Sequence, residues 1–218
     1  MELRGKTVLF FGDSITEGAL LTDYHNSFGA VIAQKTGATV YTNSLCGTRI
    51  ARQFADGKRE KYSDFCGRAA REDRPADVVA IFGGTNDFGH GDAPIGDPAD
   101  RTVYTFWGAL HILFDTLHEK YPAAKIVVVT PLHRLDEQNP RGENGQKPTE
   151  VGTLSDYVEI MRKAAGEYGF PVLDLFAEAG LLPTDPPADD PFFFDGLHPR
   201  EAGHAYLADR MIEFFARL

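Results

Sequence analysis

The segment TVLFFGDSITEG, which runs from Thr7 to Gly18, decides the fold of this 218-residue chain. Its apolar run VLFF (8–11) is rich in residues that favour strands, and such a run predicts a strand buried on both faces of a parallel sheet. The turn dipeptide Gly12-Asp13 ends this strand, and Ser14 follows it. Ligands of open α/β sheets gather at the carboxyl ends of the strands, so Ser14 lies where chemistry is expected. The alternative is that Ser14 only caps the next helix.

Length and charge limit the classes of protein to which the chain can belong. A chain of 218 residues can form one sizeable core, and we expect a single domain over residues 1–218. The formal net charge of −10 argues against nucleic acid or an anionic membrane surface as a partner, because both select a basic face. No apolar run approaches the roughly 20 residues of a membrane span, so we expect no integral membrane association.

The N-terminus and the cysteines indicate a cellular compartment. The first apolar run is followed by an acidic turn instead of the small-residue cleavage site of a signal peptide, so we expect a cytoplasmic protein.

Cys46 and Cys66 are the only cysteines, and their spacing fits no metal site. Two thiols in a reducing compartment are therefore predicted, with one disulfide as the alternative.

Strand and helix patterns alternate along the rest of the chain. Further strands are predicted at residues 39–44, 77–82, 125–130 and 171–175. Helices are predicted at residues 28–37, 102–121 and 154–168, in parts of 49–73, and from Pro199 onward to Leu218. This alternation produces right-handed crossovers and a parallel sheet covered on both faces, so the predicted fold class is α/β. The polar stretch 133–149 is longer than most connections and is a candidate functional loop.

Small polar residues follow three of the predicted strands. These strand ends are Gly12-Asp13-Ser14, Cys46-Gly47 and Gly84-Thr85-Asn86. The carboxyl ends of parallel strands lie at one edge of the sheet, so the three segments should converge there. This convergence favours a catalytic role for Ser14 over a simple capping role.

A serine hydrolase needs a nucleophile, a base, a group that orients the base, and donors for an oxyanion. Ser14 and Ser44 are predicted at strand ends, and Ser14 is preferred because its strand is the more apolar. His198 is the preferred base because Asp195 precedes it by three residues, so the carboxylate can reach one ring nitrogen while the other faces a serine. An ordinary turn is the alternative interpretation. The histidines that stay open as bases are those in predicted loops, His25, His90 and His133.

Donors for an oxyanion and contacts to substrate are expected near the same residues. Asn86 carries an amide that can donate, and Gly47 has a backbone N–H that no side chain shields. A plain polar turn is the alternative for residues 83–87. The aromatic run FFF (192–194) precedes the Asp195 turn, and we expect one ring to wall the acyl pocket, with core packing as the alternative. The residues expected to contact substrate are Asp13, Phe194 and Leu197.

Four short blocks of the sequence resemble those of the SGNH hydrolases, the GDSL-type esterases and lipases. The first, GDSIT (12–16), is similar to the block that carries the nucleophile. Gly47, in NSLCG (43–47), falls where the second block has its oxyanion glycine. GTND (84–87) resembles the third block, and DGLHP (195–199) resembles the last. The blocks occur in order from Gly12 to Pro199.

The resemblance implies a flavodoxin-like three-layer α/β/α sandwich with a five-stranded parallel sheet. It implies a catalytic triad of Ser14, Asp195 and His198. It also implies an oxyanion hole formed by the backbone N–H groups of Ser14 and Gly47 with the Asn86 amide. The implied activity is hydrolysis of carboxylic esters through an acyl-enzyme, with no cofactor and no metal. Short-chain acyl or acetyl esters of small molecules or sugars are the expected substrates.

Three other interpretations stay open from the residues. A flavodoxin-like protein would bind the phosphate of a nucleotide or flavin through Ser14 and Thr16, although Asp13 and Glu17 repel phosphate. Metal-dependent hydrolysis would use oxygen and nitrogen ligands, although their spacing matches no known site; the candidates are Asp13, Asp87, His90 and Asp92. A nucleophilic pair of Cys46 with a histidine is the third, although such a cysteine is more often a small buried residue.

Overall fold

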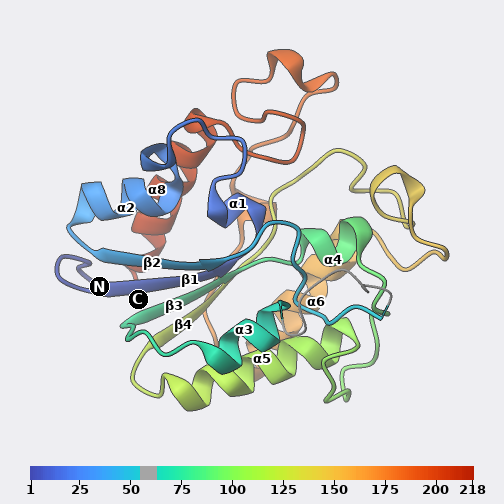
Figure 1. Cartoon of the computed structure of the whole chain (residues 1–218), viewed down its shortest axis with the longest axis horizontal. Coiled ribbons are helices and arrows are strands. Elements are labelled where there is room, and N and C mark those ends of the chain that lie inside the picture. Colours follow the sequence, from blue (N-terminus) through green and yellow to red (C-terminus); the bar gives the residue numbers. More distant parts are fainter. Residues whose placement is uncertain (55–62) are drawn as a thin grey trace.

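The computed structural model describes residues 1–54 and 63–218. Among these residues, five parallel strands form one sheet in the order β2-β1-β3-β4-β5 (Figure 1). The strands are β1 (Thr7–Gly12), β2 (Thr39–Ser44), β3 (Val78–Phe82), β4 (Lys125–Val129) and β5 (Val172–Leu173). The predicted α/β class with a five-stranded parallel sheet is confirmed.

Helices cover both faces of this sheet, which gives the three predicted layers (Figure 1). One face carries α2 (Phe28–Thr36) and α8 (Glu201–Phe215). The other face carries α3 (Phe65–Arg71), α5 (Phe106–Lys120) and α6 (Leu154–Tyr168). The remaining helical segments are short: α1 (Ser14–Glu17), α4 (Thr85–His90), α7 (Leu175–Glu178) and the 3-10 turns η1 (Tyr24–Asn26), η2 (Glu143–Gly145) and η3 (Pro187–Asp189).

The apolar run of β1 is explained by two separate cores. Leu9 and Phe11 pack with α3, α5 and α6, whereas Val8 and Phe10 pack with α2 and α8. Side chains alternate between the faces of a strand, so a strand that is covered twice must be apolar at every position. All four side chains are completely buried.

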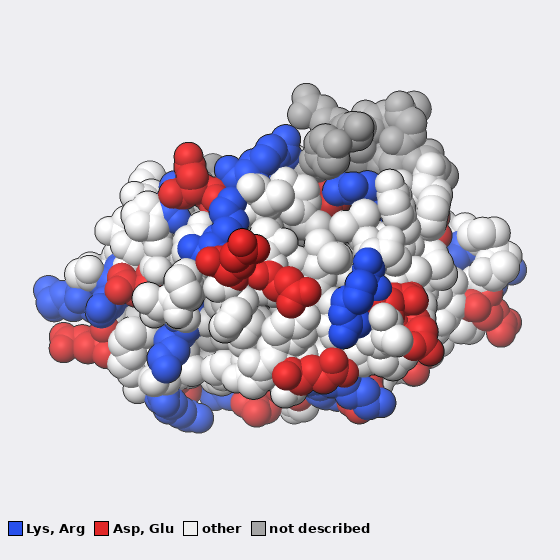
Figure 2. All heavy atoms as spheres, turned by 90° about the horizontal axis from the view of Figure 1, so that it is seen from below, with Lys and Arg blue, Asp and Glu red and all other residues white. Residues whose placement is uncertain are grey.

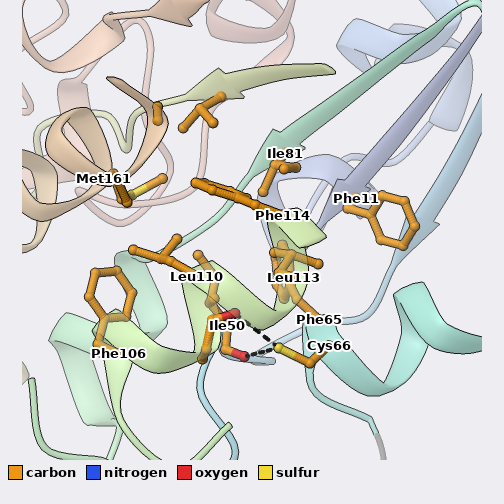
Figure 3. Packing of buried hydrophobic residues seen from close by; sticks show 14 of the residues in the cluster. Phe11, Ile50, Phe65, Cys66, Ile81, Phe106, Leu110, Leu113, Phe114 and Met161 are labelled. Carbon is orange, nitrogen blue, oxygen red and sulfur yellow. Dashed lines mark hydrogen bonds between the residues drawn. The ribbon is translucent and has the colours of Figure 1, made fainter. Parts of the chain in front are cut away.

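The core on the α5 side fixes the helices that carry part of the site (Figure 3). Phe114 and Leu113 of α5 lie between this helix and the sheet residues Ile81 and Phe11 (Figure 3). Cys66 of α3 is buried beside them, and its Sγ donates hydrogen bonds to the carbonyl oxygens of Ile50 (3.6 Å) and Ala109 (3.3 Å). Burial raises the pKa of this thiol far above its usual value.

The two cysteines lie in different environments and are not joined by a disulfide. Cys46 is exposed in the turn after β2, whereas Cys66 is buried in the core. The alternative of one disulfide is therefore not what the structure shows.

The structure corrects the start of one predicted helix and decides two points that the sequence left open. Residues 83–87 are more than a plain turn: Gly84 has a φ of +99°, in the left-handed region that favours glycine, and it leads the chain from β3 into α4. The helix predicted at 102–121 begins only at Phe106, because the Thr105 hydroxyl caps it by accepting a hydrogen bond from the Gly108 N–H at 3.2 Å. In the charged segment 49–73, the helix covers Phe65–Arg71, and residues 55–62 lie outside the described part of the chain.

The face formed by α3 and α5 carries acidic and basic side chains side by side (Figure 2). On the part of this face that the structure describes, the basic groups form no continuous stripe of the kind that tracks a phosphate backbone. Among the described helices, none is both long and apolar enough to cross a membrane.

Candidate active site

Ser14 is the first residue of α1, directly after β1, and is 3% exposed. Gly12 permits this tight connection, since a Cβ atom there would lie 1.9 Å from Oγ1 of Thr16. Oδ1 of Asp13 caps the short helix by accepting a hydrogen bond from the Ile15 N–H at 3.0 Å. The neighbouring strands β1 and β3 form the switch point of the sheet, where connections leave in opposite directions. Ser14 therefore occupies the position at which sheets of this order bind their ligands.

Ser14, His198 and Asp195 form a continuous hydrogen-bonded chain. His198 Nε2 lies 2.9 Å from Ser14 Oγ, and His198 Nδ1 lies 2.7 Å from Asp195 Oδ2. The backbone holds the carboxylate, because its Oδ1 accepts hydrogen bonds from the N–H groups of Leu197 (3.0 Å) and His198 (2.8 Å). These contacts join the strand end that carries Ser14 to the turn that precedes α8.

The charge of Asp195 sets the proton positions in this chain. Partial burial raises the pKa of Asp195, but hydrogen bonds from the backbone and ring of His198 outweigh burial and hold the pKa below its usual value. A charged carboxylate can only accept, so the neutral His198 ring carries its proton on Nδ1. Its Nε2 is then an acceptor for the Ser14 hydroxyl.

The second and third strand ends are tied to each other beside Ser14. Residues 45–48 form a turn in which Thr48 N–H donates to the Leu45 carbonyl oxygen at 3.2 Å, and Gly47 has a φ of +68°. Asn86, in the first turn of α4, is 2% exposed and donates through Nδ2 to the Thr48 carbonyl oxygen at 3.1 Å. The turn also reaches α1, because Cys46 N–H donates to Glu17 Oε2 at 2.6 Å. The predicted convergence of the three strand ends is therefore present.

Arg68 is a buried residue of this region that the sequence pattern did not indicate. It lies in α3, within the charged segment 49–73, and is 7% exposed. Its guanidinium donates to the carbonyl oxygens of Gly12 and Asn43 at the ends of β1 and β2 and to the Thr48 hydroxyl. No local pattern distinguishes it from the arginines of an exposed helix, because its partners at the strand ends, Gly12, Asn43 and Thr48, are distant in sequence.

A cavity of about 410 Å³ lies beside the triad. It is lined by residues 134–136, 143–144, 185 and 195–198, so Leu197 lines it as well as His198 and Asp195. Phe194 is not among the lining residues: its ring lies 4.6 Å from the Arg200 guanidinium. Phe193 is completely buried in the core on the α8 side. Asp13 is also buried, and it contacts the backbone of α1.

The long polar stretch 133–149 forms one wall of this cavity. Arg134 anchors it by donating to Thr85 of α4 and, at 2.6 Å, to Glu143 Oε2 within the stretch. Lys147 Nζ donates to the Asp87 carbonyl oxygen at 2.8 Å. Leu135 N–H donates to the Gly196 carbonyl oxygen at 3.0 Å. The loop is therefore attached both to the third strand end and to the turn that holds Asp195.

Two of the histidines that were open as bases and one of the candidate metal ligands make other contacts in the part of the chain that the structure describes. His25 Nδ1 lies 2.8 Å from Asp23 Oδ1, and His133 Nδ1 lies 2.9 Å from Glu137 Oε1. Among the described residues, no three histidine, cysteine, aspartate or glutamate side chains cluster in a way that could hold a metal ion. Asp87 instead accepts hydrogen bonds from the backbone N–H groups of Ile50 and Ala51, both at 2.9 Å.

Comparisons with known proteins find the same fold in solved structures. One solved structure is 30% identical, with a TM-score of 0.85 over 100% of this chain and 99% of that one. A protein from Lactobacillus plantarum is 26% identical, with a TM-score of 0.81 over 98% of both chains. A carbohydrate acetylesterase from Sinorhizobium meliloti has the same fold, with 17% identity and a TM-score of 0.67 over 97% of this chain and 99% of that one.

A search of curated protein sequences finds no match. The model of the GDSL-like lipase/acylhydrolase family matches residues 10–206. This match includes all four sequence blocks and the hydrogen-bonded chain from Ser14 to Asp195. The chain therefore belongs to the GDSL-like lipase/acylhydrolase family of hydrolases.

Proposed function

We propose that this chain is a serine esterase that hydrolyses short-chain acyl or acetyl esters of small molecules or sugars through an acyl-enzyme intermediate. The observation that carries the proposal is the hydrogen-bonded chain Ser14–His198–Asp195, with links of 2.9 Å and 2.7 Å, at the switch point of the sheet. Nucleophile, base and orienting acid need this order of contacts.

The proposed first step forms a bond between Ser14 Oγ and the ester carbonyl carbon while His198 Nε2 takes the hydroxyl proton. The resulting imidazolium is stabilised by the Asp195 carboxylate. When the tetrahedral intermediate collapses, the bond to the alcohol breaks and His198 returns the proton to the leaving oxygen. A water molecule then attacks the acyl-enzyme by the same proton route, which releases the acid and restores Ser14.

The negative oxygen of the tetrahedral intermediate needs donors that are already in place. We assign this role to the backbone N–H groups of Ser14 and Gly47 and to the Asn86 amide. The contact of Asn86 with the Thr48 carbonyl oxygen supports its assignment, because one amide hydrogen orients the group and the second stays available.

The cavity beside His198 supports a small polar alcohol portion of the substrate. Its lining includes the polar or charged side chains of Asp136, Asn144 and Asp185. Such a lining suits hydroxyl groups better than a long apolar chain, which would cover these polar groups without forming hydrogen bonds to them.

The proposal is tested by measuring hydrolysis in wild type, Ser14→Ala and Ser44→Ala. The substrates are p-nitrophenyl esters of increasing acyl length and acetylated sugars. Ser44 is the matched control because it ends β2 as Ser14 follows β1. We expect Ser14→Ala to lower kcat by about 10⁴–10⁶-fold, Ser44→Ala to retain most activity, and wild-type rates to decrease with acyl length. Full activity in Ser14→Ala would contradict the proposed nucleophile.

A further inference from the structure

We propose that Arg68 is a positioning residue for the oxyanion hole, because its guanidinium fixes the backbone segments that present all three donors. This inference rests on the proposed function. Arg68 touches neither the Ser14 hydroxyl nor the imidazole in the structure, so its role is indirect.

The first set of contacts fixes the ends of the two strands that precede the donors. Arg68 Nη2 donates to the Gly12 carbonyl oxygen at 2.9 Å, two residues before Ser14. Arg68 Nη1 donates to the Asn43 carbonyl oxygen and, at 3.0 Å, to Asn43 Oδ1. Strands β1 and β2 pair directly here, with Gly12 opposite Ser44. One guanidinium therefore sets the relative position of the two strand ends.

A further contact, with Thr48, connects Arg68 to the turn after β2 and to α4. Arg68 Nη2 lies 3.1 Å from the hydroxyl of Thr48, the residue after Gly47. The Thr48 hydroxyl in turn donates to the Leu45 carbonyl oxygen at 2.7 Å, which closes the turn around Gly47. The carbonyl oxygen of Thr48 accepts the Asn86 amide at 3.1 Å. Through one threonine, Arg68 is thus connected to the second and third proposed donors.

The guanidinium is itself held from the side of α3. Its Nε donates to the Ser63 carbonyl oxygen at 3.0 Å, and its Cζ lies 4.5 Å from the centre of the Phe65 ring. Asp64 caps α3 by accepting the Gly67 N–H at 2.8 Å, and Phe65 and Cys66 anchor the helix in the core. A fixed donor array of this kind costs little reorganisation during the reaction.

Lysine cannot reproduce this set of contacts. Arginine presents five N–H donors in a rigid plane, whereas lysine carries three donors on a single flexible nitrogen. Burial lowers the pKa of Arg68 to about 10, and the Asp13 carboxylate opposes this shift, so the group is charged at neutral pH. Arg68→Lys therefore keeps a basic nitrogen and removes the planar arrangement of donors.

Steady-state kinetics and inhibition by an alkyl boronic acid test the proposal in Arg68→Lys, Arg68→Met and the control Arg162→Met. Arg162 is a matched partly buried arginine that makes two hydrogen bonds to Asp174, beside β5. We expect both Arg68 variants to lower kcat by about 10–10²-fold with KM within about twofold, since small displacements of positioned groups have effects of this size. The inhibition constant for the boronic acid, whose tetrahedral adduct needs the same donors, should rise in parallel.

Thr48→Val keeps the test decisive if the Arg68 variants do not fold. This change removes the hydroxyl that contacts Arg68 while preserving the shape of the side chain, and it should lower kcat severalfold without changing KM. Near wild-type kcat and boronic acid affinity in folded Arg68→Lys, or an effect no larger than that of Arg162→Met, would overturn the proposal. Ser14→Ala, measured in the same assay, separates the proposed function from the proposed role of Arg68. Activity in Ser14→Ala would contradict Ser14 as the nucleophile, whereas the comparison of the Arg68 variants with Arg162→Met could still be interpreted.

Discussion

At the scale of single residues, two aspartates make nearly the same contact with a histidine ring in different settings. Asp195 Oδ2 lies 2.7 Å from His198 Nδ1, and Asp23 Oδ1 lies 2.8 Å from His25 Nδ1. His198 also reaches the Ser14 hydroxyl, whereas the His25 side chain is 82% exposed at the surface. The contact itself is therefore not what makes a histidine a base. The proposed role of His198 as the base is supported by the further hydrogen bond from its ring to the buried Ser14.

Asp195→Asn should lower kcat by about 10⁴-fold, the size of the effect known for this change in a serine protease. The neutral amide can present an N–H to Nδ1, which favours the ring proton on Nε2 and removes the acceptor for the serine hydroxyl. Asp23→Asn is the matched control and should leave kcat unchanged. Comparable activity in the two variants would show that the orienting acid lies elsewhere.

At the scale of elements, the loop 133–149 and the Asp195 turn are in direct contact. Gly196 has a φ of +82°, and a Cβ atom placed there would lie 2.5 Å from Cγ and Cδ1 of Leu135. The backbone of the two segments is also joined by the hydrogen bond from Leu135 N–H to the Gly196 carbonyl oxygen at 3.0 Å. The position of the loop therefore affects the turn that holds the carboxylate.

Gly196→Ala should destabilise the fold and lower kcat, because the new methyl group meets Leu135 and the backbone stays in the left-handed region. Overpacking costs about 1–3 kcal/mol and the left-handed backbone about 1–2 kcal/mol. In Gly196→Ala with Leu135→Ala, the collision is removed and only the backbone cost should persist. Urea unfolding of both variants and of Leu135→Ala measures this difference, and purely additive effects would argue against the contact.

The central strands β1 and β3 were predictable because a twice-covered strand is apolar along its length. Residues 39–44, at the edge of the sheet, also form a strand with the predicted bounds. The strand predicted at 171–175 has only two residues, because Asp174 leaves the sheet to cap α7 by accepting the Ala177 N–H at 3.1 Å. Ser14, Asp195 and His198 lie in short local motifs that can be recognised. Arg68 could not be found in this way, since its partner Gly12 is 56 residues away.

At the scale of the whole molecule, the sheet edge that gathers the site also buries acidic groups. Asp13 is 2% exposed and Asp87 is 3% exposed. Burial raises the pKa of Asp13 to about 6 and that of Asp87 to about 7, although backbone hydrogen bonds and nearby cationic groups oppose the shift. The native state thus keeps protons that the unfolded chain releases near pH 4. Stability contributed by these groups is fully present below the ordinary pKa of 3.8 and is lost as the pH rises from there to about 6 for Asp13 and about 7 for Asp87.

Asp13→Asn should remove its share of this pH dependence. The pKa of Asp13 is about 6 in the native state, compared with an ordinary value of 3.8. Wild type therefore loses stability as the pH rises and the variant does not, so the free energy of unfolding of the variant minus that of wild type should increase by about 2 kcal/mol between pH 4.5 and pH 8. Urea unfolding at the two pH values measures this change. Asp23→Asn is the control with the opposite sign, because hydrogen bonds from the His25 backbone and ring lower the pKa of exposed Asp23. A relative stability of Asp13→Asn that does not vary with pH would contradict the assignment.

Covalent labelling with a fluorophosphonate tests the proposed role of Ser14 most directly. The nucleophile forms a bond to phosphorus and fluoride leaves. The phosphonyl group stays on the nucleophilic residue, so peptide mass spectrometry identifies that residue. We predict one adduct on Ser14, loss of esterase activity in proportion to labelling, and much slower labelling of His198→Ala, which lacks the base. An adduct on Ser44, or no adduct in enzyme that hydrolyses esters, would contradict the proposed mechanism.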